Sequence, residues 1–132
     1  MALSELEIKT AVYQFLHGSE LAQAITGMVY KDALPSNSKV ENIHIGVVDS
    51  DTEQVQDFSI NVKVFVPDVP RQTDMIENGP RLTELADMCL SLLKSAAYGK
   101  LNLKLKKQRI LPVQGEIPFH VISNSLSIKC SE

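Results

Sequence analysis

The chain has 132 residues, of which 44% are hydrophobic and 22% charged, and its net charge of −3 corresponds to a pI near 5.6. This length and composition predict one globular domain, residues 1–132, that can fold without a metal or a disulfide. The acidic balance argues against duplex DNA or an anionic membrane as the main partner, because both attract a concentrated positive charge. The apolar runs are too short to cross a bilayer, and Glu5 and Glu7 lie where a signal peptide would be apolar, so we expect a soluble, cytoplasmic chain.

Residues 4–16 have the pattern of an amphipathic helix. Ser4 and Glu7 form a capping box at its start, and apolar residues recur at helical spacing. The following Gly18 suits a left-handed cap at the helix end. The apolar stripe consists of Ile8, Ala11, Val12, Phe15 and Leu16.

A second, shorter helix is predicted over residues 20–25, with Ser19 as its N-cap. Gly27 ends it, and residues 28–30 are expected to be a short extended piece. Residues 31–39 have the composition of a loop.

Residues 41–48 and 58–66 alternate apolar and polar side chains, which predicts two half-buried strands. The polar turn over residues 49–52 should join them into a hairpin. Residues 67–79 contain two prolines and are predicted to be a long irregular segment, which is often functional in a compact domain.

The second main helix should open at Pro80 and end before Gly99. Val62 and Leu92 lie in the middle of a strand stripe and a helix stripe, so we expect both to be buried between the two layers. The helix stripe consists of Leu82, Leu85, Ala86, Cys89, Leu92, Leu93 and Ala96.

Two more strands are predicted, over residues 101–105 and 120–130. Cys89 on the helix stripe and Cys130 on the last strand are expected to be buried free thiols, with a disulfide as the alternative. The complete pattern predicts an α+β fold: an antiparallel or mixed sheet of about four to five strands, with two main helices packed on one face.

No residue pattern indicates a catalytic, cofactor or metal site. His17, His44 and His120 have no second ligand at metal-binding spacing, and the chain has no GxSxG, Walker A or GxGxxG motif. The acidic run at residues 49–53 lacks the glycine and the flanking helices of an EF-hand loop. We therefore expect no catalytic residue, no cofactor and no metal ligand, and not an enzyme.

The one basic concentration lies within residues 100–109. Lysines on the solvent face of an edge strand prevent edge-to-edge aggregation, and that is our interpretation of this run. A contact with nucleic acid or an acidic partner is the alternative, although the run has no aromatic residue to stack on bases. Its members are Lys100, Lys104, Lys106, Lys107 and Arg109.

A helix and a short second helix are followed by Gly27-Met28-Val29-Tyr30, a strand over residues 59–65, a helix over residues 82–96 and two closing strands. This succession resembles the small tail-terminator and tail-completion proteins of long-tailed bacteriophages and prophages. The first of these segments is similar to the family's Gly-x-Val-Tyr step, and residues 59–65 are similar to its central strand. Family members often carry Pro-Tyr before the second strand, where this chain has Glu41-Asn42.

The resemblance implies a non-catalytic virion morphogenesis protein that caps the tail tube or joins the tail to the head as a homo-oligomeric ring, with a hexamer among the sizes allowed. It implies copies of the chain itself, the major tail tube protein or a head–tail connector as partners, and no cofactor. Nucleic acid would be present only as DNA passing through the ring. Such a protein would occur in the cytoplasm of the host bacterium and in the virion.

Three other functions stay open: a related neck or head–tail connector, a small enzyme or ligand-binding domain with a site assembled from scattered residues, and a toxin or nucleic-acid-binding domain that uses the basic run. For a ring, the irregular segment should contact a neighbour through Val69, Met75 and Ile76. Asp49 and Asp51, in the polar turn, are expected to reach the rim of the ring or its tail contact.

Overall fold

The computed structural model describes residues 4–35, 38–51 and 56–130, and for residues 49–51 and 56 it describes the backbone alone. Two helices, α1 (Glu5–His17) and α2 (Glu20–Ala24), lie at the start of the chain, and α3 (Gly79–Leu93) lies in its second half. The strands are β1 (Val29–Tyr30), β2 (Asn42–Asp51), β3 (Gln56–Pro67), β4 (Val69–Arg71), β5 (Asp74–Ile76), β6 (Ser95–Tyr98), β7 (Leu101–Val113) and β8 (Phe119–Cys130).

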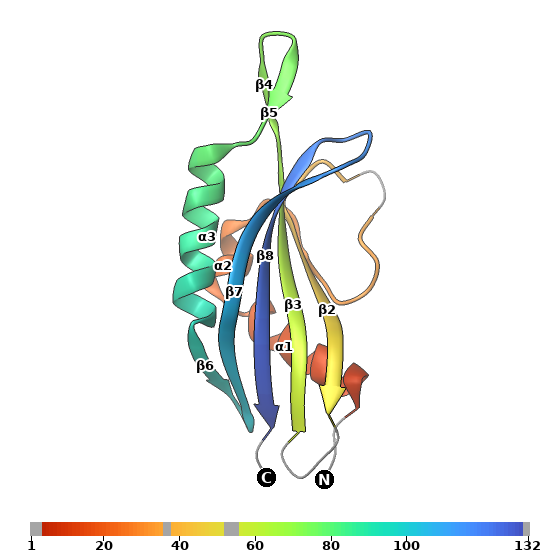
Figure 1. Cartoon of the computed structure of the whole chain (residues 1–132), viewed down its shortest axis with the longest axis vertical. Helices are drawn as coiled ribbons and strands as arrows, with labels where there is room; N and C mark the ends of the chain where they lie inside the picture. Colours follow the sequence, from red (N-terminus) through yellow and green to blue (C-terminus); the bar gives the residue numbers. More distant parts are fainter. Residues whose placement is uncertain (1–3, 36–37, 52–55, 131–132) are drawn as a thin grey trace.

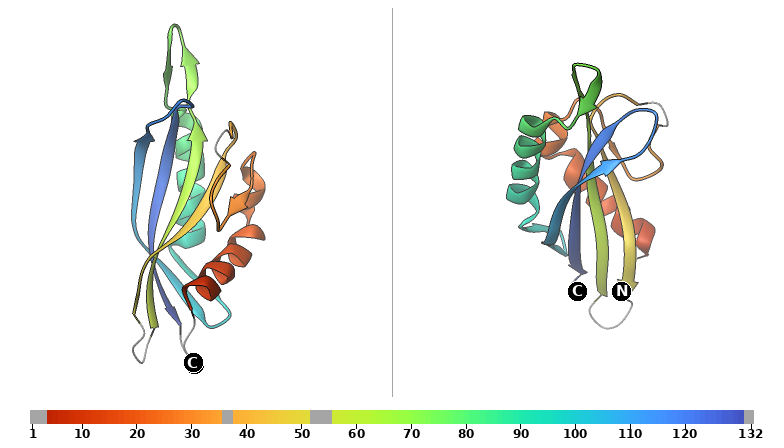
Figure 2. Two further views of the ribbon diagram at one scale, coloured as in Figure 1. Left: turned by 90° about the vertical axis from the view of Figure 1, so that its right-hand side faces the viewer. Right: turned by 45° about the horizontal axis from the view of Figure 1, so that its top comes forward.

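Six strands form one twisted sheet in the order β1-β2-β3-β8-β7-β6. β1 runs parallel to β2, and all the remaining neighbouring pairs are antiparallel. The three helices lie along one face of this sheet, and in the described part of the chain the other face carries no helix (Figures 1 and 2). The α+β class agrees with the prediction. The prediction of four to five strands was wrong, because the short strands β1 and β6 extend the two edges to six.

The core lies between the helices and the covered face of the sheet. The central strand β3 buries every second side chain, as its alternation predicts, and Val62 is completely buried. The largest completely buried side chains are Phe58, Ile8, Leu16, Leu21, Ile43, Ile45, Ile60, Leu85, Leu93, Ile122 and Ile128.

The start of α1 has the predicted capping box. The Ser4 amide donates to Glu7 Oε1 at 3.0 Å, and the Glu7 amide donates to Ser4 Oγ at 3.1 Å. The predicted left-handed cap was wrong, because Gly18 has a φ of −89°. The chain turns directly into α2, where Ser19 Oγ accepts from the Ala22 amide, so no left-handed residue is needed.

The end of α3 differs from the prediction. The helix ends at Leu93, and Ala96 belongs to β6, where it pairs with Leu103. Gly99, with a φ of +60°, lies in the two-residue turn between β6 and β7. Leu93 is completely buried while Leu92 is half-buried, so the prediction that Leu92 faces the sheet was wrong: Leu92 lies on the flank of α3 that faces α2.

Two predicted turns contain strand. The predicted turn at residues 49–52 is strand as far as Asp51, which pairs with Asp57 after a bulge between Val47 and Asp49; residues 52–55 lie outside the described part. The segment 67–79 is not irregular, because β4 and β5 pair within it. In the described residues, no helix has the combined length and apolar character needed to cross a membrane.

Candidate functional site

The most prominent feature outside the core is the hairpin of β4 and β5, residues 69–76, which we call the arm. It continues beyond the end of β3 and projects from the body (Figures 1 and 2). Val69 and Ile76 are half-buried at its base, whereas Met75 is 44% exposed. A two-stranded hairpin of this size is marginally stable in water by itself. The predicted contact residues of this segment therefore lie together on the arm, largely outside the chain's own core.

The tip of the arm is a two-residue turn closed by an ion pair. Gln72 has a φ of +51°, the conformation required at the first turn residue of a type I′ or II′ hairpin, where glycine is the usual choice. Arg71 bonds both oxygens of Asp74, with Nε–Oδ1 at 3.2 Å and Nη2–Oδ2 at 2.8 Å. This exposed pair adds little stability. It does hold the Arg71 guanidinium at the tip of the arm.

The base of the arm is held by His120, at the start of β8. Its Nδ1 lies 2.7 Å from Asp68 Oδ1, and its Nε2 lies 3.8 Å from Glu77 Oε2. Asp68 precedes β4 and Glu77 follows β5, so one imidazole contacts both ends of the arm. The Asp68 amide also donates to the Pro118 carbonyl at 3.1 Å. Through these two carboxylate contacts, His120 ties both ends of the arm to the start of β8.

Replacing His120 with alanine should loosen the arm more than the body. Loss of the Asp68 contact should speed amide hydrogen exchange in residues 69–76 by about tenfold, while exchange in β3 and β8 changes much less. His120→Asn is the matched control, because its amide can donate from a position near Nδ1 and should retain most of the protection. Equal exchange in the arm for the alanine variant and the unmodified chain would contradict the anchoring role.

Asp49 and Asp51 lie at the opposite end of the molecule from the arm. They end β2 at its junction with the start of β3, and the arm follows the end of β3. Twelve strand residues separate these two ends by about 40 Å. The structure therefore does not bring the two predicted sets of contact residues together.

A partly buried ion pair, which no pattern in the sequence predicted, joins three segments. Arg81, in the first turn of α3, bonds Glu41 through Nε–Oε2 at 2.7 Å and Nη2–Oε1 at 2.8 Å, and it also bonds Glu84 and the Ala24 carbonyl. The Glu41 side chain is only 9% exposed, and the bonds to it raise the pKa of the guanidinium. A cation in the first turn of a helix is unfavourable because the N-terminal end of the helix dipole is positive. The position of Arg81 in the sequence could therefore have indicated that an acidic residue pairs with it.

The same cluster fixes the chain around Gly27. Thr26 and Glu41 make two hydrogen bonds: the Thr26 amide donates to Glu41 Oε1 at 3.2 Å, and the Glu41 amide donates to Thr26 Oγ1 at 2.9 Å. Asn42 Oδ1 accepts from the Met28 amide at 3.1 Å. Glu41-Asn42, where the resembling family often carries Pro-Tyr, is therefore the polar link between the second helix and the sheet.

A second buried polar group lies in the core under α3. Asn124 is completely buried; its Nδ2 donates to the Val62 carbonyl at 3.0 Å, and its Oδ1 accepts from Gln108 Nε2 at 2.9 Å. Gln108 also donates to the Ala86 carbonyl.

Burial raises the pKa of the Cys89 thiol to about 11, so this thiol is protonated at neutral pH. Cys89 and Cys130 are free and buried, as predicted.

The three histidines lie apart. His17 ends α1 and stacks near Tyr13, with ring centroids 5.5 Å apart, His44 lies within β2, and His120 anchors the arm. Burial lowers the pKa of His44, which favours its neutral form. Within the described ranges, no three His, Cys, Asp or Glu residues are grouped as metal ligands.

Four of the five residues of the basic run lie on β7, and Lys100 lies in the turn that precedes this strand. This strand pairs with β6 only from Leu101 to Lys104, so beyond that point β7 forms the edge of the described sheet. Lys104, Lys107 and Arg109 pair with serines of β8 that alternate with its buried residues, which puts them on the face opposite the core. The edge-strand interpretation therefore fits the second half of the run.

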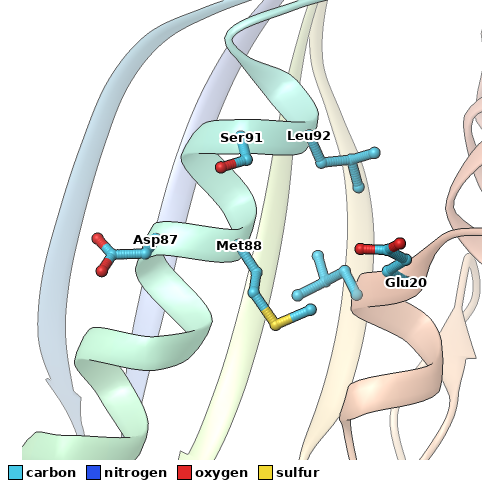
Figure 3. Close-up of a pocket in the computed structure, with 6 residues that line it drawn as sticks. Glu20, Asp87, Met88, Ser91 and Leu92 are labelled. Carbon is cyan, nitrogen blue, oxygen red and sulfur yellow. The ribbon is translucent and has the colours of Figure 1, made fainter.

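A groove lies between α2 and α3, beside the core. It has a volume of about 370 Å³ and is lined by Glu20, Leu21, Asp87, Met88, Ser91 and Leu92. Met88 and Leu92 point from α3 toward α2, and Glu20 faces them (Figure 3). Its lining combines the apolar Leu21, Met88 and Leu92 with two acidic residues, of which Asp87 points away from α2 (Figure 3).

A scan against models of known protein families finds no match for this chain. A search of curated proteins also finds none that matches.

Proposed function

We propose that this chain is a virion morphogenesis protein of a long-tailed phage or prophage, and that it acts as a ring of identical subunits. The ring would cap the tail tube or join the tail to the head. The role requires no catalytic group and no cofactor, and its partners would be neighbouring copies and the tail tube or connector.

The observation that carries this proposal is the arm. Its apolar side chains have little core to pack against. The contacts of His120 with Asp68 and Glu77 at its base fix the direction in which it projects. A projecting segment of this kind suits a subunit that assembles into a ring, because head-to-tail contacts join two different surfaces of neighbouring copies. The order of helices and strands along the chain, which resembles that of the tail-completion proteins, supports the same role.

The test is a deletion of the gene in the phage or prophage that encodes it, followed by electron microscopy of tails. We expect tails of irregular length, or tails without heads, and restoration by the gene supplied in trans. Tails of normal length that fail to join heads would favour the neck connector over the tail cap. Uniform tails joined to heads in the deletion strain would refute both.

Native mass spectrometry of the purified protein at rising concentration is the second measurement. A ring predicts one closed oligomer with a defined subunit number, because a head-to-tail contact that closes stops growth. An enzyme or ligand-binding domain has no such requirement, so the two measurements together separate the classes.

A further inference from the structure

The face of the sheet without helices concentrates positive charge, although the chain as a whole has a net charge of −3 (Figures 1 and 2). This face carries the residues of β3, β7 and β8 that alternate with the buried core residues. The acidic residues of β2 and β3 lie at one corner of the sheet, where Asp51 pairs with Asp57. The basic residues of the face are Lys63, Lys104, Lys107, Arg109 and Lys129.

Three of these cations follow one another along β7, and each pairs with a serine of β8. Successive serines are two residues apart, so the cations and the hydroxyl groups form two parallel rows that repeat at about 7 Å. Among the described residues, none makes an ion pair or a side-chain hydrogen bond with any of the three cations. Lysine, arginine and serine side chains are typical contacts of nucleic-acid phosphates. The pairs are Lys104 with Ser127, Lys107 with Ser125 and Arg109 with Ser123.

Protection of the sheet edge explains only part of this charge. Lys63 lies on β3 and Lys129 on β8, and both of these strands have a neighbour on either side. In one row across the sheet, Ser123 lies between Arg109 and Lys63. Neighbouring strands are about 4.8 Å apart, so the backbones of these two cations are about 10 Å apart. Both long side chains can therefore approach one anionic group above Ser123.

The two rows end at a pocket on the same face. Phe65 of β3 and Phe119 of β8 are half-buried there, and with Val113 they line a volume of about 380 Å³. Pockets that hold small organic groups begin at about 300 Å³. Gln114 and Glu116 are exposed and add an amide and a carboxylate to the lining, groups that can bond to the edge of a base. Aromatic side chains beside a positively charged surface are the usual platform for unpaired bases.

We propose that the face without helices binds single-stranded nucleic acid. The phosphates would follow the cations and serines of β7 and β8, and one unpaired base would enter the pocket lined by Phe65 and Phe119. A single strand suits this surface better than a duplex, because a paired base must first be unstacked to enter a pocket. An acidic protein would match the cations alone and has no base for the aromatic pocket. The inference goes beyond the proposed function and does not rest on it.

Fluorescence anisotropy of a labelled oligothymidylate about 12 nucleotides long measures the binding, since single-strand sites cover about 4–16 nucleotides. The variant Lys107→Gln with Arg109→Gln should weaken binding at least about tenfold at low salt. It should also reduce the slope of log Kd against log salt by about 1.4, because each phosphate contact with a single strand contributes about 0.7. The matched control, Lys94→Gln with Arg71→Gln, removes the same two charges from the end of α3 and the tip of the arm, and should change neither quantity.

The base site has a measurement of its own. The unmodified chain should bind oligothymidylate at least about ten times more tightly than an abasic strand of the same length, because stacking adds to the phosphate contacts. Phe65→Leu should lose most of this difference and keep its affinity for the abasic strand. The ratio of two affinities for one variant does not change if part of the sample is unfolded. Phe119→Leu is the second variant, and the thermal transition of each is measured before binding.

Three results would overturn the proposal: no binding of the strand at low salt, equal effects of the two double variants, or a duplex of the same length that binds as tightly as the single strand. Polyglutamate of equal charge that competes as well as the oligomer would assign the face to an acidic protein and reject nucleic acid. Each of these results leaves the proposed tail function standing. Uniform, head-joined tails in the deletion strain would reject that function and leave the nucleic-acid site intact.

Discussion

Replacing Gly27 with alanine should lower the free energy of unfolding by about 3 kcal/mol, the cost of forcing extra volume into a closely packed place. A Cβ at this position would lie 2.1 Å from Asn42 Oδ1 and 2.2 Å from the Glu41 carbonyl oxygen. The carbonyl belongs to the backbone and cannot rotate away. The Asn42 oxygen accepts a hydrogen bond from the Met28 amide, so moving this oxygen away from Gly27 would break that bond.

Gly79→Ala is the matched control for this prediction. No atom lies within 4 Å of a Cβ built on Gly79, which is the first residue of α3. Alanine there should change the free energy of unfolding by less than about 1 kcal/mol, in the stabilising direction, because the unfolded chain loses freedom. Chemical denaturation measures both variants, and equal effects at the two glycines would contradict the close approach at Gly27.

Arg81→Met should destabilise the fold by about 3–5 kcal/mol, because it leaves the Glu41 carboxylate buried without its partner. Arg81 supplies two bonds to that carboxylate, and the side chain of Glu41 is 9% exposed. The double variant Glu41→Gln with Arg81→Met should recover much of the loss. A neutral amide carries no charge to desolvate and can still accept from the Thr26 amide.

The control for Arg81 is Arg71→Met in the arm. That arginine also makes a bidentate pair, but its side chain is 60% exposed and its partner Asp74 is 56% exposed. Its loss should cost less than about 1 kcal/mol. If denaturation finds the Arg81 single and double variants equally unstable, then the charge of Glu41 is not what makes Arg81 necessary.

The candidate site was only partly visible in the sequence. Val69, Met75 and Ile76 were predicted as contacts because they are apolar and lie outside any helix or strand pattern. The pairing of β4 with β5 was missed, because each strand has only three residues and too short an alternation to recognise. His120 was seen only as one of three scattered histidines, since its partner Asp68 lies 52 residues earlier.

Adjacent apolar residues show why the layer contacts were partly wrong. Leu92 and Leu93 both fit a helical stripe, and 100° of rotation separates them on α3. Packing against α2 and the sheet decided that Leu93 is buried and Leu92 borders the groove. Likewise Ala96 continues the helical spacing of α3. In the structure it belongs to β6 instead, because β7 lies alongside and Leu103 of β7 pairs with it.

The sequence by itself determined the elements whose signals are local: the capped helix α1, the alternating strand β3, the start of α3 and the α+β class. Periodicity and capping act between residues a few positions apart, so they can be recognised without the fold. Only the tertiary structure decided the six-strand order, the link from Arg81 to Glu41, the buried Asn124 and the direction of the arm. Each of these depends on residues between 16 and more than 60 positions apart, which only the packing of the sheet and helices brings into contact.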